Sequence, residues 1–298
     1  MSSIKRQELP PPQYEYGGDD CIFVELARDM SFDANFKAQS ITRTVRERDL
    51  PGIIEVAPGN TSYLVQFDPG ILEPDDLIEA LKEIERNIDV TEYEWEATVF
   101  DIPVLYQDPW TEETLLKFRD RHQDPEATDL EYCAKINGFD SVEAFTDYHS
   151  DAPHMVMYLG FIPGLSQSYQ MRPRDEQITV PKYEKPRTDT PARAIGQGGS
   201  FTSIYPVQSA GGYQLYGRLP IEVIDIEQTL PDFEDRIVLP KSGDILKFRK
   251  IDREEYDSIR DEVEAKTYRT KTGTIEFNSK RFFEDPDSYN EKIVEVIS

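Results

Sequence analysis

The chain has 298 residues, enough for about two domains, and its 38% hydrophobic and 11% aromatic residues suffice for folded cores. Its formal net charge of -25 comes from 58 acidic residues against 33 lysines and arginines, and a surface of this kind repels nucleic-acid phosphates and anionic membranes. No apolar stretch reaches the length of a membrane span, and the first residues lack the apolar core of a signal peptide. Cys21 and Cys133 form no metal-binding or redox spacing, so we expect a reduced, cytoplasmic protein.

The first 108 residues predict a tail and a small α+β domain. Residues 1–18 are rich in proline and polar side chains and predict a flexible tail. Residues 19–108 alternate between strand and helix patterns, with strands expected at 21–26, 53–57, 62–67 and 92–104 and helices at 31–48 and from Pro74 onward. The order is β-α-β-β-α-β, which predicts a ferredoxin-like domain.

Residues 109–148 predict a helical connector between two domains. Three short helices are expected, with Thr111, Asp129 and Ser141 as N-caps, and Gly138 ends the second of them.

Short strands bounded by proline and glycine fill residues 149–251 and predict an antiparallel barrel or sandwich. Residues 252–298 predict a helical C-terminal extension. Its first helix is expected at 253–266, with Tyr256, Ile259 and Val263 on the apolar face.

Glycines, prolines and basic residues are dense between His149 and Arg218, and the candidate site is expected there. The run Gly160 to Gly164 is either a nest of backbone N–H groups for an oxyanion or a tight turn. Arg187 and the nearby lysines either capture an anionic group or pair with acids in a solvated loop.

The remaining glycine-rich runs and the histidines do not fit known nucleotide-binding or metal-binding patterns. The run IGQGGS has neither the following lysine of a P-loop nor the Rossmann spacing, and Gly211-Gly212 is either a second anion nest or a bulge. His122, His149 and His154 have no metal-ligand spacing, so no metal is expected. His149 is either a general acid or base or a structural histidine.

Taken in order, these motifs resemble a known family. They are His149-Ser150, GF-P-G at 160–164, KPR at 185–187, IYP at 204–206, Gly211-Gly212 and Gly217-Arg218, with Asp101-Ile102-Pro103-Val104 further upstream. The series is similar to allophanate hydrolase subunit 1, also called the carboxyltransferase subdomain C and D family. Its members include the 5-oxoprolinase B subunit, a sporulation kinase inhibitor and the C–D part of urea carboxylase. The resemblance implies a small α+β domain followed by a cyclophilin-like β-barrel.

The resemblance also implies which residues form the site. The catalytic residues would be His149, Lys182 and Arg187. The substrate-binding residues would be Gly160, Phe161, Pro163, Gly164, Tyr205, Gly211, Gly212 and Arg218, together with Arg193 and Phe201, where the chain departs from the family and its own specificity is expected.

The chain departs from the family pattern at several of these positions. Arg193 stands in a run that reads P-A-G-S-V in the family, and Phe201 stands where a glutamine is usual. Gly164 to Tyr169 and Ala210 to Tyr213 also differ, so we expect a reshaped pocket.

The resemblance implies a function shared between chains. The chain would form an active site with a subunit 2 partner, the A–B half of a biotin-dependent carboxyltransferase, acting on a small urea, amide or carbonyl compound. The helical connector and the length beyond Ile251 favour this urea-carboxylase branch. The alternatives are the B subunit of an ATP-dependent lactam hydrolase and a regulatory kinase-binding protein without activity. Biotin on a partner carrier, or ATP, is the implied cofactor, and neither is expected on this chain alone.

Overall fold

The computed structural model describes residues 3–89 and 91–298, and they form two compact units. One, the N-terminal unit, comprises residues 3–95 together with 276–284; the other, the barrel unit, comprises 96–275 and 285–298. The α+β class is confirmed. The structure divides the chain after Trp95 rather than after residue 108, because residues 94–106 form one continuous strand.

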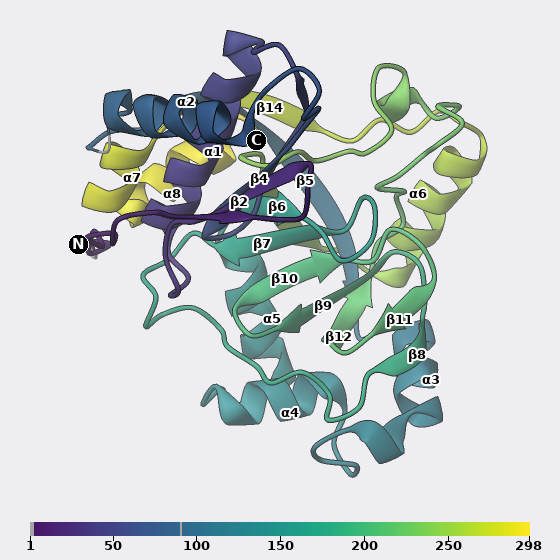
Figure 1. Cartoon of the computed structure of the whole chain (residues 1–298). Coiled ribbons are helices and arrows are strands. Elements are labelled where there is room, and N and C mark those ends of the chain that lie inside the picture. The colour runs from purple at the N-terminus through teal and green to yellow at the C-terminus, as the bar shows by residue number, and fades with distance from the viewer. Residues whose placement is uncertain (1–2, 90) are drawn as a thin grey trace. The chain divides into compact units, whose positions relative to one another are not determined.

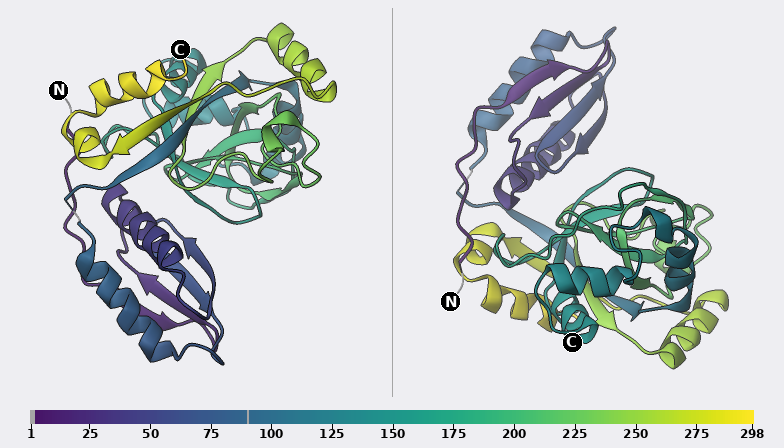
Figure 2. Two further views of the ribbon diagram at one scale, coloured as in Figure 1. Left: turned by 90° about the horizontal axis from the view of Figure 1, so that it is seen from above. Right: turned by 90° about the horizontal axis from the view of Figure 1, so that it is seen from below.

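The N-terminal unit is built on a four-stranded antiparallel sheet in the order β1-β2-β4-β3. Its strands are β1 (Gln13–Tyr16), β2 (Cys21–Glu25), β3 (Ile53–Pro58) and β4 (Ser62–Phe67). The helices α1 (Phe32–Arg48) and α2 (Pro74–Asn87) run alongside this sheet (Figure 2).

The ferredoxin-like prediction is wrong at its last strand. The predicted strand at 92–104 is β5 (Glu94–Tyr106), and it joins the sheet of the barrel unit instead. The edge position beside β2 is taken by β1, which lies in the predicted flexible tail. The tail prediction is therefore wrong for residues 13–16. The register pairs Tyr14 with Val24 and Tyr16 with Ile22.

The core of the N-terminal unit follows the predicted periodicities. Tyr63, Val65 and Phe67 of β4 are buried on the face toward the helices. Helix α1 begins where the Ser31 side chain accepts a hydrogen bond from the Ala34 N–H at 3.1 Å.

A C-terminal segment completes this unit. Residues 276–284 contain the end of β14 (Thr272–Asn278) and helix α7 (Ser279–Glu284). The Phe277 ring lies 5.5 Å from that of Phe36 and 4.4 Å from that of Trp95, measured between centroids. The predicted C-terminal extension is thus divided between the two units. Its sequence has no periodicity that indicates this division.

The barrel unit contains seven strands that close into a ring. They are β5, β6 (His154–Leu159), β7 (Ser166–Gln170), β9 (Ala194–Gly198), β10 (Phe201–Ile204), β12 (Gln214–Arg218) and β13 (Ile245–Lys250). Their order is β12-β9-β10-β7-β6-β13-β5, and pairing between β12 and β5 closes the ring, while β14 lies on the other side of β5. Figure 1 shows β7, β10, β9 and β12 side by side.

The barrel is not wholly antiparallel. Strands β5 and β13 run parallel, with Phe248 opposite Ile102, so the antiparallel prediction is wrong for this pair. Three of the expected short strands, at residues 177–181, 221–226 and 236–240, reduce to single bridges, Val180 with Gly199 and Ile224 with Val238. Strands β8 (Arg187–Thr190) and β11 (Ser209–Gly211) form a separate two-stranded arm.

The predicted helical connector belongs to the barrel unit. Its helices are α3 (Pro109–Lys117), α4 (Asp129–Ile136) and α5 (Val142–Asp151), with a 3-10 turn at Arg119–Arg121. Leu130, Cys133 and Phe145 enter the same buried cluster as the barrel strands, so this segment covers the barrel instead of linking two domains. The remaining helices of the unit are α6 (Arg253–Glu264), α8 (Pro286–Glu295) and a 3-10 turn at Pro231–Phe233.

Two of the three predicted helix caps are shifted. Asp108, not Thr111, caps α3, with Pro109 at the first helical position. Thr128, not Asp129, caps α4 and forms a capping box with Glu131. The shift matters because it releases the Asp129 side chain for other contacts. Ser141 caps α5 as predicted.

Candidate functional site

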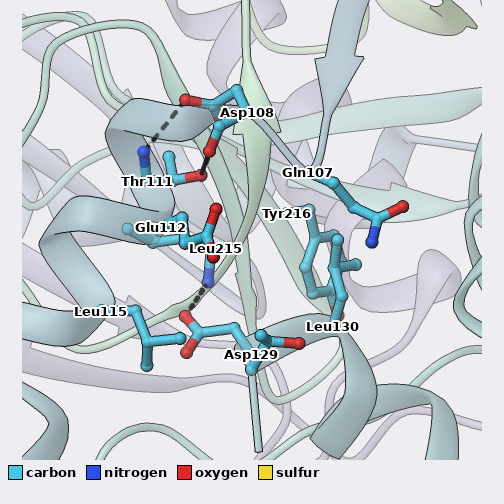
Figure 3. A pocket seen from close by; sticks show the side chains of 10 residues that line it. Gln107, Asp108, Thr111, Glu112, Leu115, Asp129, Leu130, Leu215 and Tyr216 are labelled. Atoms are coloured by element: carbon cyan, nitrogen blue, oxygen red, sulfur yellow. Dashed lines mark hydrogen bonds between the residues drawn. The ribbon is translucent and has the colours of Figure 1, made fainter.

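A cavity of about 190 Å³ lies within the barrel unit, beside α3, the start of α4 and strand β12. Ten residues line it: Gln107, Asp108, Thr111, Glu112, Leu115, Thr128, Asp129, Leu130, Leu215 and Tyr216 (Figure 3). We refer to this space as the α3–α4 cavity. Three of its lining side chains are carboxyls, and the polar ones outnumber the aliphatic ones.

Asp108 is placed by the turn between β5 and α3. Gln107 has a φ of 54°, a left-handed conformation that is uncommon outside glycine, and it aims the chain from strand into helix. The Asp108 carboxylate accepts hydrogen bonds from the Trp110 and Thr111 N–H groups at 3.0 Å and from the Thr111 hydroxyl at 2.5 Å. Burial raises the pKa of this carboxyl, against the effect of these hydrogen bonds and of the Arg218 charge.

Asp129 stands at the first turn of α4 and is almost wholly buried. It accepts a hydrogen bond from the Leu215 N–H at 2.6 Å and one from the Tyr183 hydroxyl at 2.5 Å. Burial raises the pKa of Asp129, and the largest opposing effect is the charge of Arg187. The carboxyl therefore ties α4 to β12 and to the loop that carries Tyr183.

Glu112 differs from both aspartates because its side chain is exposed. Among residues 3–89 and 91–298, none forms a hydrogen bond or an ion pair with its carboxylate. It is thus the cavity carboxylate with the most capacity to accept new hydrogen bonds.

Arg187, a predicted catalytic residue, is fully buried. Its guanidinium donates to the Tyr213 carbonyl at 2.7 Å and to the Thr190 hydroxyl at 3.3 Å, and its carbon lies 4.4 Å from the centre of the Tyr183 ring. Its Nη1 atom has no hydrogen-bond partner in the described part of the chain. Most of the contacts of this side chain hold the β8–β11 arm to its surroundings.

His149, another predicted catalytic residue, is also fully buried. Its Nδ1 atom lies 2.8 Å from the Tyr106 hydroxyl and its Nε2 atom 3.2 Å from that of Thr202. Burial lowers the pKa of His149 to about 3, with a further contribution from Lys247. An imidazole with this pKa is neutral at working pH, so burial disfavours a role as general acid.

Lys182 and the glycine pair lie near Arg187. Lys182 is exposed, with its Nζ atom 5.3 Å from the centre of the Tyr213 ring. A Cβ atom on Gly211 would clash with the Tyr205 hydroxyl, so this glycine is required by close packing. A Cβ atom on Gly212 would meet only ordinary contacts at 3.8 Å.

The segment Gly160 to Gly164 connects β6 to β7. It forms a turn in which the Gly160 N–H donates to the Leu165 carbonyl at 3.0 Å. Phe161 is 71% exposed, and Pro163 is also exposed. None of the residues 160–164 lines the α3–α4 cavity. The anion-nest reading of this run stays a prediction.

Tyr205, also a predicted residue, is buried against Gly211, and the three remaining predicted residues lie in two places. Phe201 stacks on Tyr169 with ring centroids 4.5 Å apart. Arg193 and Arg218 lie close to Trp110, Glu222 and Arg260, near the first turn of α3. The predicted residues therefore do not form one cluster.

The sequence points to no cavity residue as a functional one. It predicts Asp129 only as a helix cap and assigns no role to Asp108, although the Asp108-Pro109 pair is a recognisable helix start. Nothing in the sequence indicates that the two aspartates share a cavity.

Two negative findings apply to residues 3–89 and 91–298. No group of three or more His, Cys, Asp or Glu residues there is arranged to hold a metal ion. No helix there is long and apolar enough to span a membrane.

The fold defines a class of protein: an α+β chain with a closed, helix-covered barrel and a separate four-stranded unit. The family model of the carboxyltransferase domain, subdomain C and D, matches residues 12–233. The chain belongs to this family, as its motifs suggest.

Several relatives are similar to this chain. The 5-oxoprolinase B subunit of Bacillus subtilis is 28% identical over 260 residues, covering 84% of this chain and 97% of its own length. The urea amidolyase of Saccharomyces cerevisiae is 25% identical over 295 residues, but this chain spans only 15% of it. The crystal structure of the Kluyveromyces lactis urea carboxylase matches 97% of this chain with a TM-score of 0.80 at 23% identity, and this chain covers 27% of that structure.

Proposed function

We propose that this chain is one half of a two-part carboxyltransferase-type enzyme and works with a separate subunit 2 chain on a small urea or amide. Family membership supports this, as does its similarity to a relative named as a subunit and to others many times longer than itself. The partner would contribute the A–B half of the active site.

The observation that carries the proposal is the lining of the α3–α4 cavity. Ureas and amides present several N–H donors on a compact, uncharged group. The cavity, of about 190 Å³, presents the carboxyls of Asp108, Glu112 and Asp129 as acceptors, with the Leu115 and Leu215 side chains beside them. Ionised carboxylates form stronger hydrogen bonds with such donors than neutral acceptors do.

The role of each carboxyl follows from its existing contacts. Asp129 has a hydrogen bond on each oxygen, so it positions the walls. Asp108 retains acceptor capacity beyond its three hydrogen bonds and would orient a substrate N–H. Glu112 would accept the proton that the substrate nitrogen loses as this nitrogen bonds to the transferred carboxyl carbon, and would return it to the donor nitrogen, whose bond to that carbon breaks.

The implied cofactors fit the cavity differently. When bound, biotin on a partner carrier would supply the activated carboxyl group. One nitrogen of its ureido ring would carry that carboxyl group, and the N–H group of the other nitrogen would suit the same carboxyl acceptors. The triphosphate of ATP does not suit a cavity lined by three carboxyls, because like charges repel, and no step on this chain is assigned to ATP.

A second candidate is the opening of a lactam, with this chain as the B subunit of an ATP-dependent hydrolase. The observation in its favour is the similarity to the 5-oxoprolinase B subunit of Bacillus subtilis over 97% of that protein. A lactam is a cyclic amide, so the same acceptors would bind it. The cyclophilin-like description of the barrel, the cytoplasmic setting and the kinase-binding alternative stay predictions.

Reconstitution with subunit 2 tests the proposal. The complex, with its carrier and carboxylase components, is assayed for fixation of labelled bicarbonate on urea and small amides, and for ATP-dependent opening of 5-oxoproline. We expect Glu112→Gln to lower turnover at least about tenfold, since one proton acceptor is typically worth a factor of 10²–10⁴.

Glu113→Gln is the matched control, because Glu113 lies on the same turn of α3, is exposed and does not line the cavity. Equal turnover in the two variants would contradict the assignment of the cavity. Turnover of 5-oxoproline without fixation of bicarbonate would replace the first candidate by the second.

A further inference from the structure

Beside the α3–α4 cavity lies a group of half-buried arginines, formed by Arg193, Arg218 and Arg260, which we call the arginine triad. Such a group is unexpected in a chain with a net charge of -25. Basic residues that gather despite an acidic background create a local attraction for anions. All three residues belong to the barrel unit.

Two members of the triad already hold a carboxylate. Glu222 Oε1 lies 2.9 Å from Arg260 Nη1 and 3.5 Å from Arg193 Nη1. Both guanidinium groups also donate to the Pro220 carbonyl, at 2.8 and 3.4 Å. Glu264 approaches Arg260 from its exposed side, at 3.5 Å. This pair of arginines is therefore fixed in place, and its two charges are formally matched by Glu222 and Glu264.

Arg218 is the member with no carboxylate. Its guanidinium lies 4.8 Å from the centre of the Trp110 ring, and its Nε atom donates to the Ala192 carbonyl at 3.1 Å. No carboxylate within the described ranges 3–89 and 91–298 comes within 4.0 Å of it. A stacked guanidinium with one anchored nitrogen is pre-organised, and its two terminal nitrogens are left for a planar, bidentate partner.

The backbone at Arg193 adds an independent observation. Its φ is 67°, in the left-handed region, where a non-glycine residue of this size is strained by about 1 kcal/mol. The strain places the Arg193 side chain beside Glu222 and Arg260. Glycine would adopt this turn without strain, so the arginine at this position indicates a role for its positive charge.

The triad adjoins the cavity through α3. Trp110, beneath Arg218, is followed by Thr111 and Glu112, which line the cavity, and the Arg218 charge acts on the Asp108 carboxyl. A ligand carboxylate on Arg218 would thus lie next to a urea or amide in the cavity.

We propose that Arg218, supported by Arg193 and Arg260, is a binding site for a single carboxylate or bicarbonate group beside the α3–α4 cavity. The Arg218 guanidinium has no carboxylate partner, and the neighbouring arginines already pair with the Glu222 carboxylate. A single available guanidinium matches a singly charged planar oxyanion better than a doubly charged phosphate. The inference deepens the proposed function, on which it rests for the identity of the anion in the reaction.

The test uses the full chain alone. Bicarbonate, acetate and phosphate are titrated as sodium salts at constant ionic strength, and the arginine Nε–Hε signals are followed by NMR. We expect bicarbonate and acetate to shift the Arg218 signal to saturation. We also expect Arg218→Gln and Arg260→Gln to weaken this binding at least about tenfold, since a hydrogen bond to a charged group carries that much.

Arg269→Gln is the matched control, because Arg269 pairs with Glu234 at 2.7 Å on another part of the barrel unit. Equal weakening in all three variants, unchanged binding in Arg218→Gln, or tighter binding of phosphate than of acetate would each overturn the proposal. A different outcome would separate the two proposals. If the wild-type chain and Arg269→Gln bind acetate and bicarbonate and the triad variants do not, while the reconstituted complex fixes no bicarbonate, the site stands and the proposed function fails.

Discussion

Arg187 and Arg218 both belong to the motifs that characterise the family, yet the structure places them in opposite environments. Arg187 is wholly buried, stacked on Tyr183 and bonded to the Tyr213 carbonyl, near the buried Asp129. Arg218 is half-buried, stacked on Trp110 and without a carboxylate partner in the described part of the chain. The comparison teaches that an arginine of a family motif can have a structural role. Existing contacts with buried groups mark such an arginine, whereas a guanidinium without a carboxylate partner is available to bind a ligand.

The largest expected effect is on stability at Arg187. Arg187→Met removes the hydrogen bond to the Tyr213 carbonyl and the positive charge that most favours the ionised Asp129 carboxyl, so we expect a loss of about 3–5 kcal/mol in the free energy of unfolding. Arg218→Met removes one hydrogen bond and one stacking contact and should cost about 1 kcal/mol. Urea unfolding of the two variants measures the difference, and similar losses would remove the contrast between the two arginines.

The arm that carries Arg187 offers a second comparison, between adjacent glycines. Gly211→Ala places a Cβ atom against the Tyr205 ring and should cost about 1–3 kcal/mol, whereas Gly212→Ala meets only ordinary contacts. Thermal unfolding of both variants is the measurement. A stable Gly211→Ala variant would show that the arm adjusts easily, contrary to the rigid packing described above.

His149 belongs with Arg187 as a buried and internally bonded residue. Its folded-state pKa of about 3 lies below the ordinary value near 6.5, so the folded chain binds fewer protons than the unfolded one between these values. Stability should therefore fall as the pH drops below about 6.5, at up to about 1.4 kcal/mol per unit more steeply than in His149→Gln. Parallel pH profiles of the two proteins would contradict the burial of a neutral imidazole.

Asp129 lines the cavity and is acted on by the Arg187 charge, and its effect on stability should change with pH in the opposite direction to that of His149. Burial raises its pKa in the folded chain, so the folded state binds more protons than the unfolded state above about pH 4. The wild-type chain should lose unfolding free energy relative to Asp129→Asn as the pH rises from about 4 toward the folded-state pKa. The difference between the two proteins isolates this group, and an increase with pH would mean that Arg187 outweighs burial.

Much of the local structure was predictable because it depends on short-range patterns. Strand β4 has its predicted bounds, and helices α1 and α6 lie within a few residues of theirs, since alternation and helical periodicity are read from neighbouring residues. The departures come from long-range pairing. No local sequence pattern near residue 94 indicates that β5 pairs with β13 and β12 rather than with the sheet of the N-terminal unit.

The candidate site was less predictable for the same reason. Asp108 stands at the start of α3 and Asp129 at the start of α4, 21 residues further along the chain, and only the fold brings them to one cavity. The glycines and arginines that stand out in the sequence divide between packing, as at Gly211 and Arg187, and an open position, as at Arg218. Residue type alone does not separate these uses.

The most direct test of the α3–α4 cavity as the substrate site is an NMR titration of the labelled full chain with urea and small amides. The account predicts that the backbone amides of Thr111, Glu112 and Leu215 shift in a saturable manner, while those of residues 160–164 and Lys182 do not. Shifts confined to residues 160–164 and Lys182, or a uniform response throughout the chain, would contradict it.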